Sequence, residues 1–266
     1  MEIFLPAKEY LPWRLRAKSR HGTHSPFLYK FLDQCLYADR NEAAFIIPET
    51  HRKNLRKDHT VISYPDPGAG SRLRALPGHN PAKQVEIRHI ARTSLQKPSY
   101  CRLYYRMVRY FGYGNILELG TSLGVTTSYM SLANTAARIH TIEGAEPIAT
   151  YAKDYFRRHN FPGITLFRGN FDNVLEDIVA GNYYDMVFID GNHKGEKVLE
   201  YFSLLTKHIH KGSVIIVDDI RWSNSMLRAW RDITASPLVT LSLDLFHTGM
   251  VFFDTRLSKE NFCIKF

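Results

Sequence analysis

The stretch that decides the fold is Asn115-Ile-Leu-Glu118-Leu-Gly120-Thr121-Ser122-Leu-Gly124-Val125. A short apolar run is followed by two glycines and the start of a helical pattern, which predicts a strand, a tight turn and a helix. A dinucleotide fingerprint G-x-G-x-x-G would need glycine at positions 118, 120 and 123, and only Gly120 satisfies it. The carboxylate of Glu118 would also repel a pyrophosphate, whereas it suits a ligand with a cationic end.

Apolar runs that alternate with helical patterns extend this unit toward the C-terminus. They predict strands at residues 115–120, 138–143, 164–169, 185–190 and 213–218. Continuous runs such as Met186-Val-Phe-Ile189 are typical of parallel strands covered on both faces. The alternation predicts an α/β fold with a doubly wound parallel sheet. Two further runs, 239–246 and 249–254, are separated by two residues and predict a C-terminal antiparallel hairpin.

The N-terminal region is predicted to be mainly helical. Ser25-Pro26 has the character of a helix cap and first residue, and a second helix at residues 100–111 places Arg102, Arg106 and Arg109 on one face. Between them, residues 58–83 are rich in proline and glycine and predict a long loop, with a substrate lid as its plausible role. We therefore divide the chain into a basic accessory or lid region, 1–98, and a second domain, 99–266.

The distribution of charged and apolar residues limits the classes of molecule that the chain is expected to bind. The chain has 266 residues and a net charge of +9. Residues 1–110 hold 20 Lys and Arg against 9 Asp and Glu, while the remainder holds 15 against 17. A basic half favours nucleic acid, an anionic lipid surface or an acidic small substrate. No apolar run approaches the roughly 18 residues of a membrane span, and the N-terminus lacks the pattern of a signal peptide, so we expect a cytoplasmic protein.

The pattern Glu118-x-Gly120-x-x-x-Gly124 resembles motif I of the class I S-adenosylmethionine (SAM)-dependent methyltransferases. The resemblance extends over about residues 99–266 and implies a Rossmann-like sheet and SAM as cofactor. Glu143 lies 19 residues after Gly124 and looks like the acidic residue that holds the ribose hydroxyls in that family. The cofactor-binding residues implied are Glu118, Gly120, Thr121, Ser122, Gly124, Glu143, Gly144, Asn170, Phe171 and Asp190. The alternative is that the glycines only permit tight packing and Glu143 is a solvated strand end.

Three carboxylates follow the fourth and fifth predicted strands, namely Asp190, Asp218 and Asp219. Carboxyl ends of adjacent parallel strands meet at one edge of a sheet, and like charges there raise one another's pKa unless a cation neutralises them. Oxygen ligands favour Mg²⁺ or another hard divalent cation. The set resembles the metal site of catechol-type O-methyltransferases, although Asp219 stands where that site has Asn. The predicted metal ligands are therefore these three residues.

His193, three residues after Asp190, is the alternative base for methyl transfer. An imidazole accepts a proton near neutral pH. Asp190, His193 and Asp218 are thus the predicted catalytic residues. Two structural interpretations remain open: His193 orients Asp190, or one of the paired aspartates caps the following helix.

The leading function is O-methylation of a hydroxyl on a small-molecule acceptor, which the basic half suggests is polar or anionic. An RNA methyltransferase is the second hypothesis, supported by the basic N-terminal region and the arginine face. Against it, the segment Asp190-Gly-Asn-His193 lacks the Asn/Asp-Pro-Pro-aromatic motif of many base-methylating enzymes. A non-catalytic SAM-binding protein is the third. A homodimer is left open.

Overall fold

The structure is a computed structural model that describes residues 5–19, 25–38, 42–64, 83–161 and 163–266. The chain forms two compact units, and each is described by itself. Unit 1 consists of residues up to Ala38 together with Glu176–Phe266, and unit 2 consists of Asp39–Leu175. The predicted boundary between residues 98 and 99 stays a prediction.

Unit 2 is built on three parallel strands, β3 (Asn115–Leu119), β4 (Arg138–Glu143) and β5 (Ile164–Arg168), with β4 in the middle. Helix α6 (Val125–Ala133) connects β3 to β4, and α7 (Glu146–Arg158) connects β4 to β5. The strands and both helices form where the sequence predicts them. Parallel strands end at the same edge of a sheet, so the loops that follow β3, β4 and β5 are neighbours.

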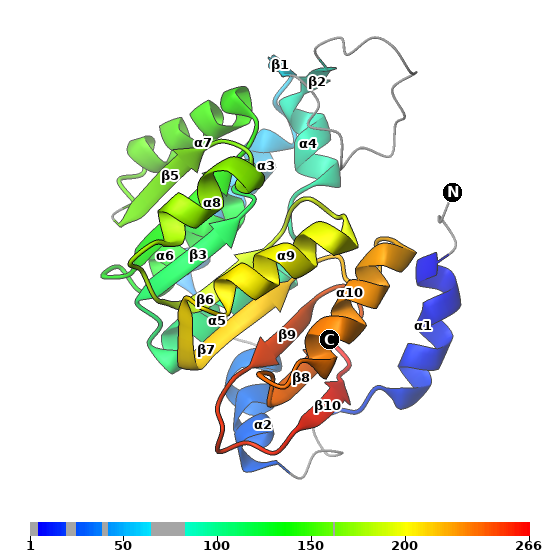
Figure 1. The fold of residues 1–266 in the computed structure, drawn as a ribbon. Helices are drawn as coiled ribbons and strands as arrows, with labels where there is room; N and C mark the ends of the chain where they lie inside the picture. Colours follow the sequence, from blue (N-terminus) through cyan, green and yellow to red (C-terminus); the bar gives the residue numbers. More distant parts are fainter. Residues whose placement is uncertain (1–4, 20–24, 39–41, 65–82, 162) are drawn as a thin grey trace. The chain divides into compact units, whose positions relative to one another are not determined.

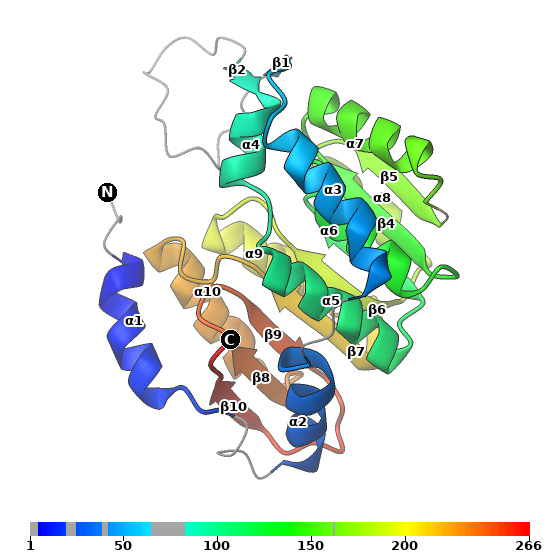
Figure 2. The same ribbon diagram turned by 180° about the vertical axis from the view of Figure 1, so that it is seen from behind.

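Three more helices belong to unit 2, namely α3 (Ile46–Leu55), α4 (Ile87–Thr93) and α5 (Pro98–Phe111). Helices α3 and α5 lie beside α6, as Figure 2 shows from behind. Strands β1 (Val61–Tyr64) and β2 (Lys83–Glu86) pair as an antiparallel hairpin. The segment predicted as a loop over 58–83 is therefore partly strand at its ends, and the β-branched Val61 and Ile62 favour this conformation in β1. Residues 65–82 of that loop lie outside the described part.

The arginine face predicted on α5 is corrected by the structure. Arg106 is a buried side chain. Arg109 pairs with Glu42 at 2.6 Å, and the guanidinium of Arg102 lies 5.3 Å from the ring centre of Phe45. The segment before α3 therefore packs against this side of the helix. Arg106 is buried, whereas Arg109 stays exposed although it is paired, so the three arginines do not form one exposed face.

Unit 1 contains the strands β6 (Tyr184–Ile189), β7 (Ile209–Val217), β8 (Leu241–Asp244), β9 (Gly249–Phe252) and β10 (Glu260–Cys263). Strand β7 is parallel to β6, and β9 is antiparallel to both β7 and β8. The predicted C-terminal hairpin is therefore confirmed. Strand β10, which the sequence analysis did not predict, runs parallel to β8.

Helices cover both faces of the unit 1 strands. Helices α9 (Gly195–Leu205) and α10 (Asn224–Ala235) lie on the face toward the viewer in Figure 1, and α2 (Pro26–Phe31) lies on the opposite face in Figure 2. A π-helical turn, Leu32–Leu36, continues α2. Ser25 caps α2 as predicted, since its side chain accepts a hydrogen bond from the Leu28 amide.

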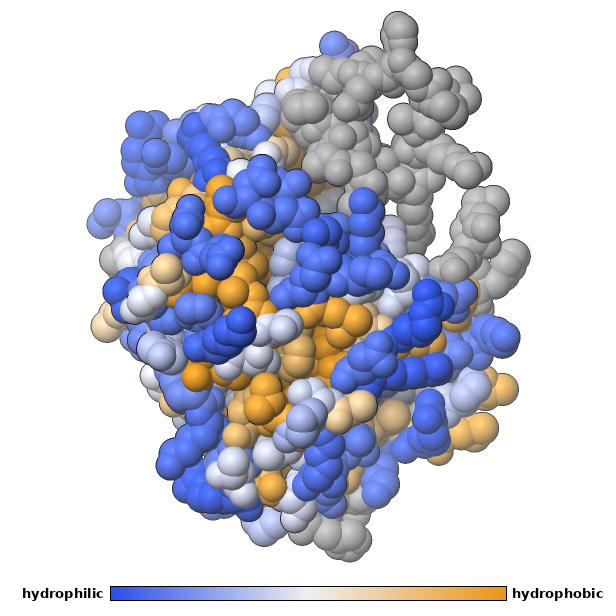
Figure 3. Space-filling view, viewed as in Figure 1, coloured by the Kyte–Doolittle hydropathy of each residue, from blue (hydrophilic) through white to orange (hydrophobic). Residues whose placement is uncertain are grey.

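Helix α1 (Leu5–Arg16) packs on unit 1 mainly through Trp13, and Tyr10 of the same helix also contacts Phe246. The Trp13 indole is buried, donates a hydrogen bond to the Asp244 carbonyl at 3.2 Å, and lies 5.2 Å from the Phe246 ring. Leu11 and Leu15 are 64% and 80% exposed, and hydrophobic colour appears at the position of α1 in Figure 3. Among the described residues, no helix has both the length and the apolar character needed to cross a bilayer.

Replacing the tryptophan should test how α1 is held. We expect Trp13→Ala to lower the free energy of unfolding by about 3 kcal/mol, because a buried aromatic side chain and its hydrogen bond are lost. Leu15→Ala, on the same helix but exposed, should change it by no more than about 0.5 kcal/mol. Urea denaturation of both variants measures the difference. Equal effects would show that α1 is not anchored through Trp13.

Candidate functional site

The loop between β3 and α6 has a backbone that only certain residues adopt easily. Gly120, Ser122 and Gly124 all have positive φ angles, of 108°, 48° and 79°. A Cβ atom added at Gly124 would lie 2.7 Å from the ring of Phe156, so both the conformation and the space require glycine there. The amides of Gly120 and Thr121 donate to one acceptor at the end of β4, the carbonyl of Ile142. The glycine motif thus shapes a loop that is fixed to the neighbouring strand.

Glu118, the acidic residue of this motif, is completely buried at the end of β3. Its Oε2 accepts hydrogen bonds from the hydroxyls of Thr127 on α6 and Thr141 on β4, at 2.5 and 2.6 Å. Burial raises the pKa of Glu118 to about 7 despite these donors. Within the described part of the chain, its buried Oε1 has no hydrogen-bond partner. That free acceptor fits a ligand, or a bridging water, that brings a donor to the loop.

Glu143 joins the loops that follow β3 and β4. Its Oε2 accepts from the Ser122 amide and its Oε1 from the Ala145 amide, both at 2.9 Å. Burial raises the pKa of this carboxyl, and the amide donors oppose the rise. The Gly144 amide is a third backbone donor to this carboxylate. A carboxylate has about four acceptor positions, so the three amides leave room for a further donor.

The loop after β5 lies next to the loop after β4. The Gly169 amide donates to the Glu143 carbonyl at 3.1 Å, and Asn170 precedes helix α8 (Phe171–Val179). The Asn170 side chain accepts from the Asp172 amide at 3.2 Å. At Gly144, an added Cβ would make only an ordinary contact of 3.8 Å, so space does not demand glycine there.

These contacts gather the predicted cofactor residues of unit 2 at one edge of its strands. The residues brought together are Gly120, Thr121, Ser122, Gly124, Glu143, Gly144, Asn170 and Phe171, with Glu118 buried beneath them. Their predicted role in holding SAM stays a prediction. Asp190, the remaining one, belongs to unit 1.

In unit 1, the acidic residues follow the ends of β6 and β7. The Asp218 amide donates to the Ile189 carbonyl at 2.9 Å, which places the two strand ends side by side. The Thr248 hydroxyl donates to Oδ1 of Asp218, which is a buried side chain. Asp190 is half-buried directly after β6. The loops that carry the predicted catalytic residues are thus adjacent, as expected for parallel strands.

His193 lies in the loop after β6 and faces the loop after β7. Its Nε2 is 3.8 Å from Oδ2 of Asp219, and its ring centre is 5.1 Å from that of Trp222. Burial lowers the pKa of His193, while the carboxylate of Asp219 acts in the opposite direction. A partly buried imidazole of this kind is neutral at neutral pH and can accept a proton. The geometry thus pairs His193 with Asp219, whereas the sequence analysis had linked it to Asp190.

The structure gives no support for a metal site at the carboxylates of Asp190, Asp218 and Asp219. In the part of the chain that the structure describes, no group of three or more His, Cys, Asp or Glu side chains is arranged to hold an ion. Asp218 receives the Thr248 hydroxyl, and Asp219 lies beside His193. The predicted metal ligands Asp190, Asp218 and Asp219 therefore stay a prediction.

A buried ion pair that the sequence analysis missed holds the loop after β7. Arg221 donates to both carboxylate oxygens of Asp244, at 2.8 and 2.6 Å, and to the Phe246 carbonyl at 2.8 Å. The Ile220 amide donates to the His247 carbonyl. These bonds fix the loop against the turn between β8 and β9. No local sequence pattern predicts this ion pair, because Arg221 and Asp244 are 23 residues apart in sequence.

Residues 117–220 match a protein family described as a methyltransferase domain. An uncharacterized protein of Acanthamoeba polyphaga mimivirus is 26% identical to this chain over 132 residues, which make up 45% of this chain and 58% of that protein. The chain therefore spans less than two thirds of the length of this curated relative.

Solved structures share the fold. The SAH-bound methyltransferase of Podospora anserina has a TM-score of 0.61 and 15% identity, and the match covers 87% of this chain and 99% of that one. The O-methyltransferase of Bacillus cereus in complex with SAH has a TM-score of 0.53 and 24% identity, covering 60% and 83%. The SAM complex of a Streptomyces achromogenes O-methyltransferase involved in tomaymycin synthesis has a TM-score of 0.55 and 17% identity, covering 84% and 94%. The predicted Rossmann-like α/β class is confirmed.

The buried carboxyl of Glu118 should make stability depend on pH. Its folded pKa, about 7, lies above its ordinary value of 4.5, so the folded state binds more protons between these values. Stability is then present at low pH and is lost as pH rises through about 7. Relative to Glu118→Gln, the ligand-free protein should lose on the order of 1 to 3 kcal/mol over this range. Denaturation at several pH values measures this, and parallel curves for both proteins would contradict it.

Proposed function

We propose that this chain, whose residues 117–220 form a class I SAM-dependent methyltransferase domain, methylates a hydroxyl oxygen of a small-molecule acceptor. The observation that carries the proposed chemistry is the pairing of His193 with Asp219 in the loops after β6 and β7. A partly buried neutral imidazole held by a carboxylate suits general-base catalysis.

The cofactor is proposed to bind at the loops after β3, β4 and β5. Glu143 offers its carboxylate oxygens to the ribose hydroxyls, and the glycine loop from Gly120 to Gly124 allows close approach of the ligand. The unpartnered Oε1 of Glu118 supports a ligand with donors at this edge. Bound SAM supplies a methyl group on a positively charged sulfur.

His193 is proposed to take the proton from the acceptor hydroxyl. Bound SAM would transfer its methyl group to the oxygen that His193 has deprotonated and would remain as a neutral thioether, so His193 would hold the only proton released. Asp219 orients the imidazole and stabilises the imidazolium that forms. Because the leaving group is neutral, this reaction needs a base and alignment, and no acid on the sulfur. No step of this proposal needs a divalent ion.

The acceptor class is a proposal that rests on two supports. Solved relatives of the same fold are O-methyltransferases by description, and the chain carries a net charge of +9, which favours a polar or anionic acceptor. RNA is the weaker alternative, because Arg106 is buried and Arg109 is paired with Glu42. A screen of hydroxylated and carboxylated small molecules with methyl-labelled SAM identifies the acceptor.

The ribose contact can be tested without an acceptor. Glu143→Ala should weaken SAM binding by roughly 1 to 3 kcal/mol, because charge-assisted hydrogen bonds to the cofactor are lost. Glu146→Ala removes a neighbouring exposed carboxylate that pairs with Arg168, and should leave the affinity unchanged. Isothermal titration calorimetry measures both. If the two variants bind SAM equally well, the proposed ribose site is misplaced.

The base can be tested once an acceptor is found. His193→Ala should lower kcat by roughly a hundredfold or more, and EDTA should have no effect. Because the pKa of His193 is lowered from 6.5, wild-type activity should hold through neutral pH and fall only below about that value. His210→Ala is the matched control, since His210 forms an exposed pair with Asp185 at 2.8 Å. Loss of turnover in EDTA with a mild His193 effect would favour the metal mechanism instead.

A further inference from the structure

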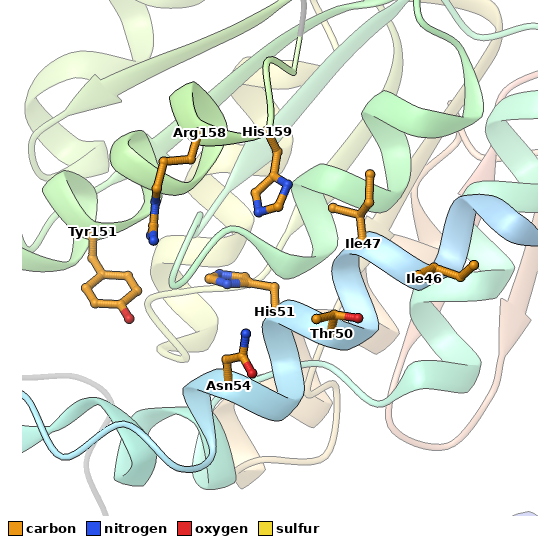
Figure 4. A pocket seen from close by; sticks show the side chains of 8 residues that line it. All are labelled: Ile46, Ile47, Thr50, His51, Asn54, Tyr151, Arg158 and His159. Carbon is orange, nitrogen blue, oxygen red and sulfur yellow. The ribbon is translucent and has the colours of Figure 1, made fainter.

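Helices α3 and α7 of unit 2 enclose a pocket of about 320 Å³ that has no part in the proposed methyl transfer (Figure 4). Residues 46–54 of α3 form one wall, and three residues from α7 and the position after it, Tyr151, Arg158 and His159, form the other. In Figure 4, the side chains of Arg158 and His159 point toward His51. The polar residues that line the pocket carry hydrogen-bond donors, and one of them carries a guanidinium. The lining therefore favours one class of ligand.

The polar lining contains a cation and no carboxylate. Thr50, Asn54, Arg158 and His159 contribute, and neither Asp nor Glu is among the lining residues. The guanidinium of Arg158 makes one hydrogen bond within the described residues, from Nε to the Asp154 carbonyl of its own helix. Its two terminal amino groups are thus available for an anion, which is the ligand that a guanidinium fork recognises best.

Nearby carboxylates are already engaged. The Tyr151 hydroxyl donates to Asp58, which also accepts from the Thr60 amide. Asp154 pairs with Arg157 at 3.1 Å. Neither carboxylate competes with a ligand for Arg158. The electrostatic balance of the pocket therefore favours a negative group.

The other end of the pocket is apolar. Ile46 and Ile47 line it from the first turn of α3, and Ile46 is 65% exposed although it is a large hydrophobic residue. Figure 4 shows both isoleucines at the end away from Arg158 and Tyr151. A ligand with an apolar body and an anionic head would cover the isoleucines while it meets the guanidinium.

His51 connects the pocket to the loop between β3 and α6. It lines the pocket yet is only 8% exposed, and its ring is stacked on Tyr155 with centres 3.5 Å apart. Its Nε2 lies 3.1 Å from the Leu123 carbonyl, which only accepts, so Nε2 carries the proton. Leu123 stands between Ser122 and Gly124 in the glycine loop. A change in the position or charge distribution of the His51 ring therefore acts directly on that loop through this hydrogen bond.

We propose that the α3–α7 pocket binds a small organic carboxylate and that His51 couples its occupation to tighter SAM binding. A negative charge beside the imidazole polarises its Nε2–H group, which strengthens the hydrogen bond to Leu123 and holds the glycine loop in place. The binding site goes beyond the proposed function. The coupling rests on the proposed position of the cofactor at this loop.

Benzoate tests the site in the absence of SAM, because it joins a carboxylate to an apolar ring. We expect saturable binding with a dissociation constant on the order of 1 mM by calorimetry or NMR titration, and none by the neutral analogue benzyl alcohol. Arg158→Gln should weaken benzoate binding at least about fivefold. Arg157→Gln is the matched control on the same helix, outside the pocket. Absence of saturable binding, or equal effects of the two variants, would overturn the site.

The coupling is tested by measuring SAM affinity with and without saturating benzoate. We expect an increase of about threefold or more, and linkage requires SAM to raise benzoate affinity by the same factor. His51→Gln should abolish the coupling while benzoate still binds. Should that variant fail to fold, the reciprocal measurement on the wild-type protein decides the question. Unchanged SAM affinity would overturn the coupling, whereas no SAM binding in either condition would overturn the proposed cofactor site and leave the benzoate result standing.

Discussion

The buried carboxylate of Glu118 is the interaction on which the architecture of unit 2 depends. One of its oxygens accepts from Thr127 on α6 and from Thr141 on β4, so a single side chain of β3 holds the next helix and the next strand. A buried carboxyl costs free energy unless it is hydrogen-bonded, and here its pKa is still raised to about 7. The structure tolerates that cost because the same contact sets the start of α6 relative to the glycine loop.

In unit 1, buried polar contacts likewise hold loops in position. Arg221 and Asp244 form a bidentate ion pair in a buried setting, and Thr248 bonds to Asp218. Such a pair contributes little net stability when its desolvation is counted, but breaking it is costly. Its value here is geometric, because it fixes the loop after β7 against the turn between β8 and β9. The antiparallel hairpin of β8 and β9 thus holds the loop that carries Asp218 and Asp219 in a fixed position.

The order of the strands from β3 to β9 could be predicted because long apolar runs and glycine turns carry a strong local signal. Glu143 and Gly124 were identified by spacing, and the structure joins Glu143 to the glycine loop through Ser122. Contacts between distant segments left no such signal. The burial of Arg106, the pairing of Arg221 with Asp244, and strand β10 all depend on tertiary packing that overrides local pattern.

Backbone strain occurs in the loops of the candidate site and in two other loops of the fold. Among the described residues, Ser122 at 48°, Asn192 at 50° and Asp219 at 52° follow β3, β6 and β7, while Phe246 at 74° follows β8 and Asn160 at 51° follows α7. Each such conformation costs about 1 to 2 kcal/mol and persists only where neighbours enforce it. The neighbours are visible: Glu143 holds the Ser122 amide, the Tyr201 hydroxyl accepts from the Asn192 amide group, and the Trp222 amide donates to the Asp219 carbonyl. Strain held in this way keeps each loop in one conformation, the loop after β3 in unit 2 and the loops after β6 and β7 in unit 1, and a loop held in advance does not have to be ordered again at each binding event.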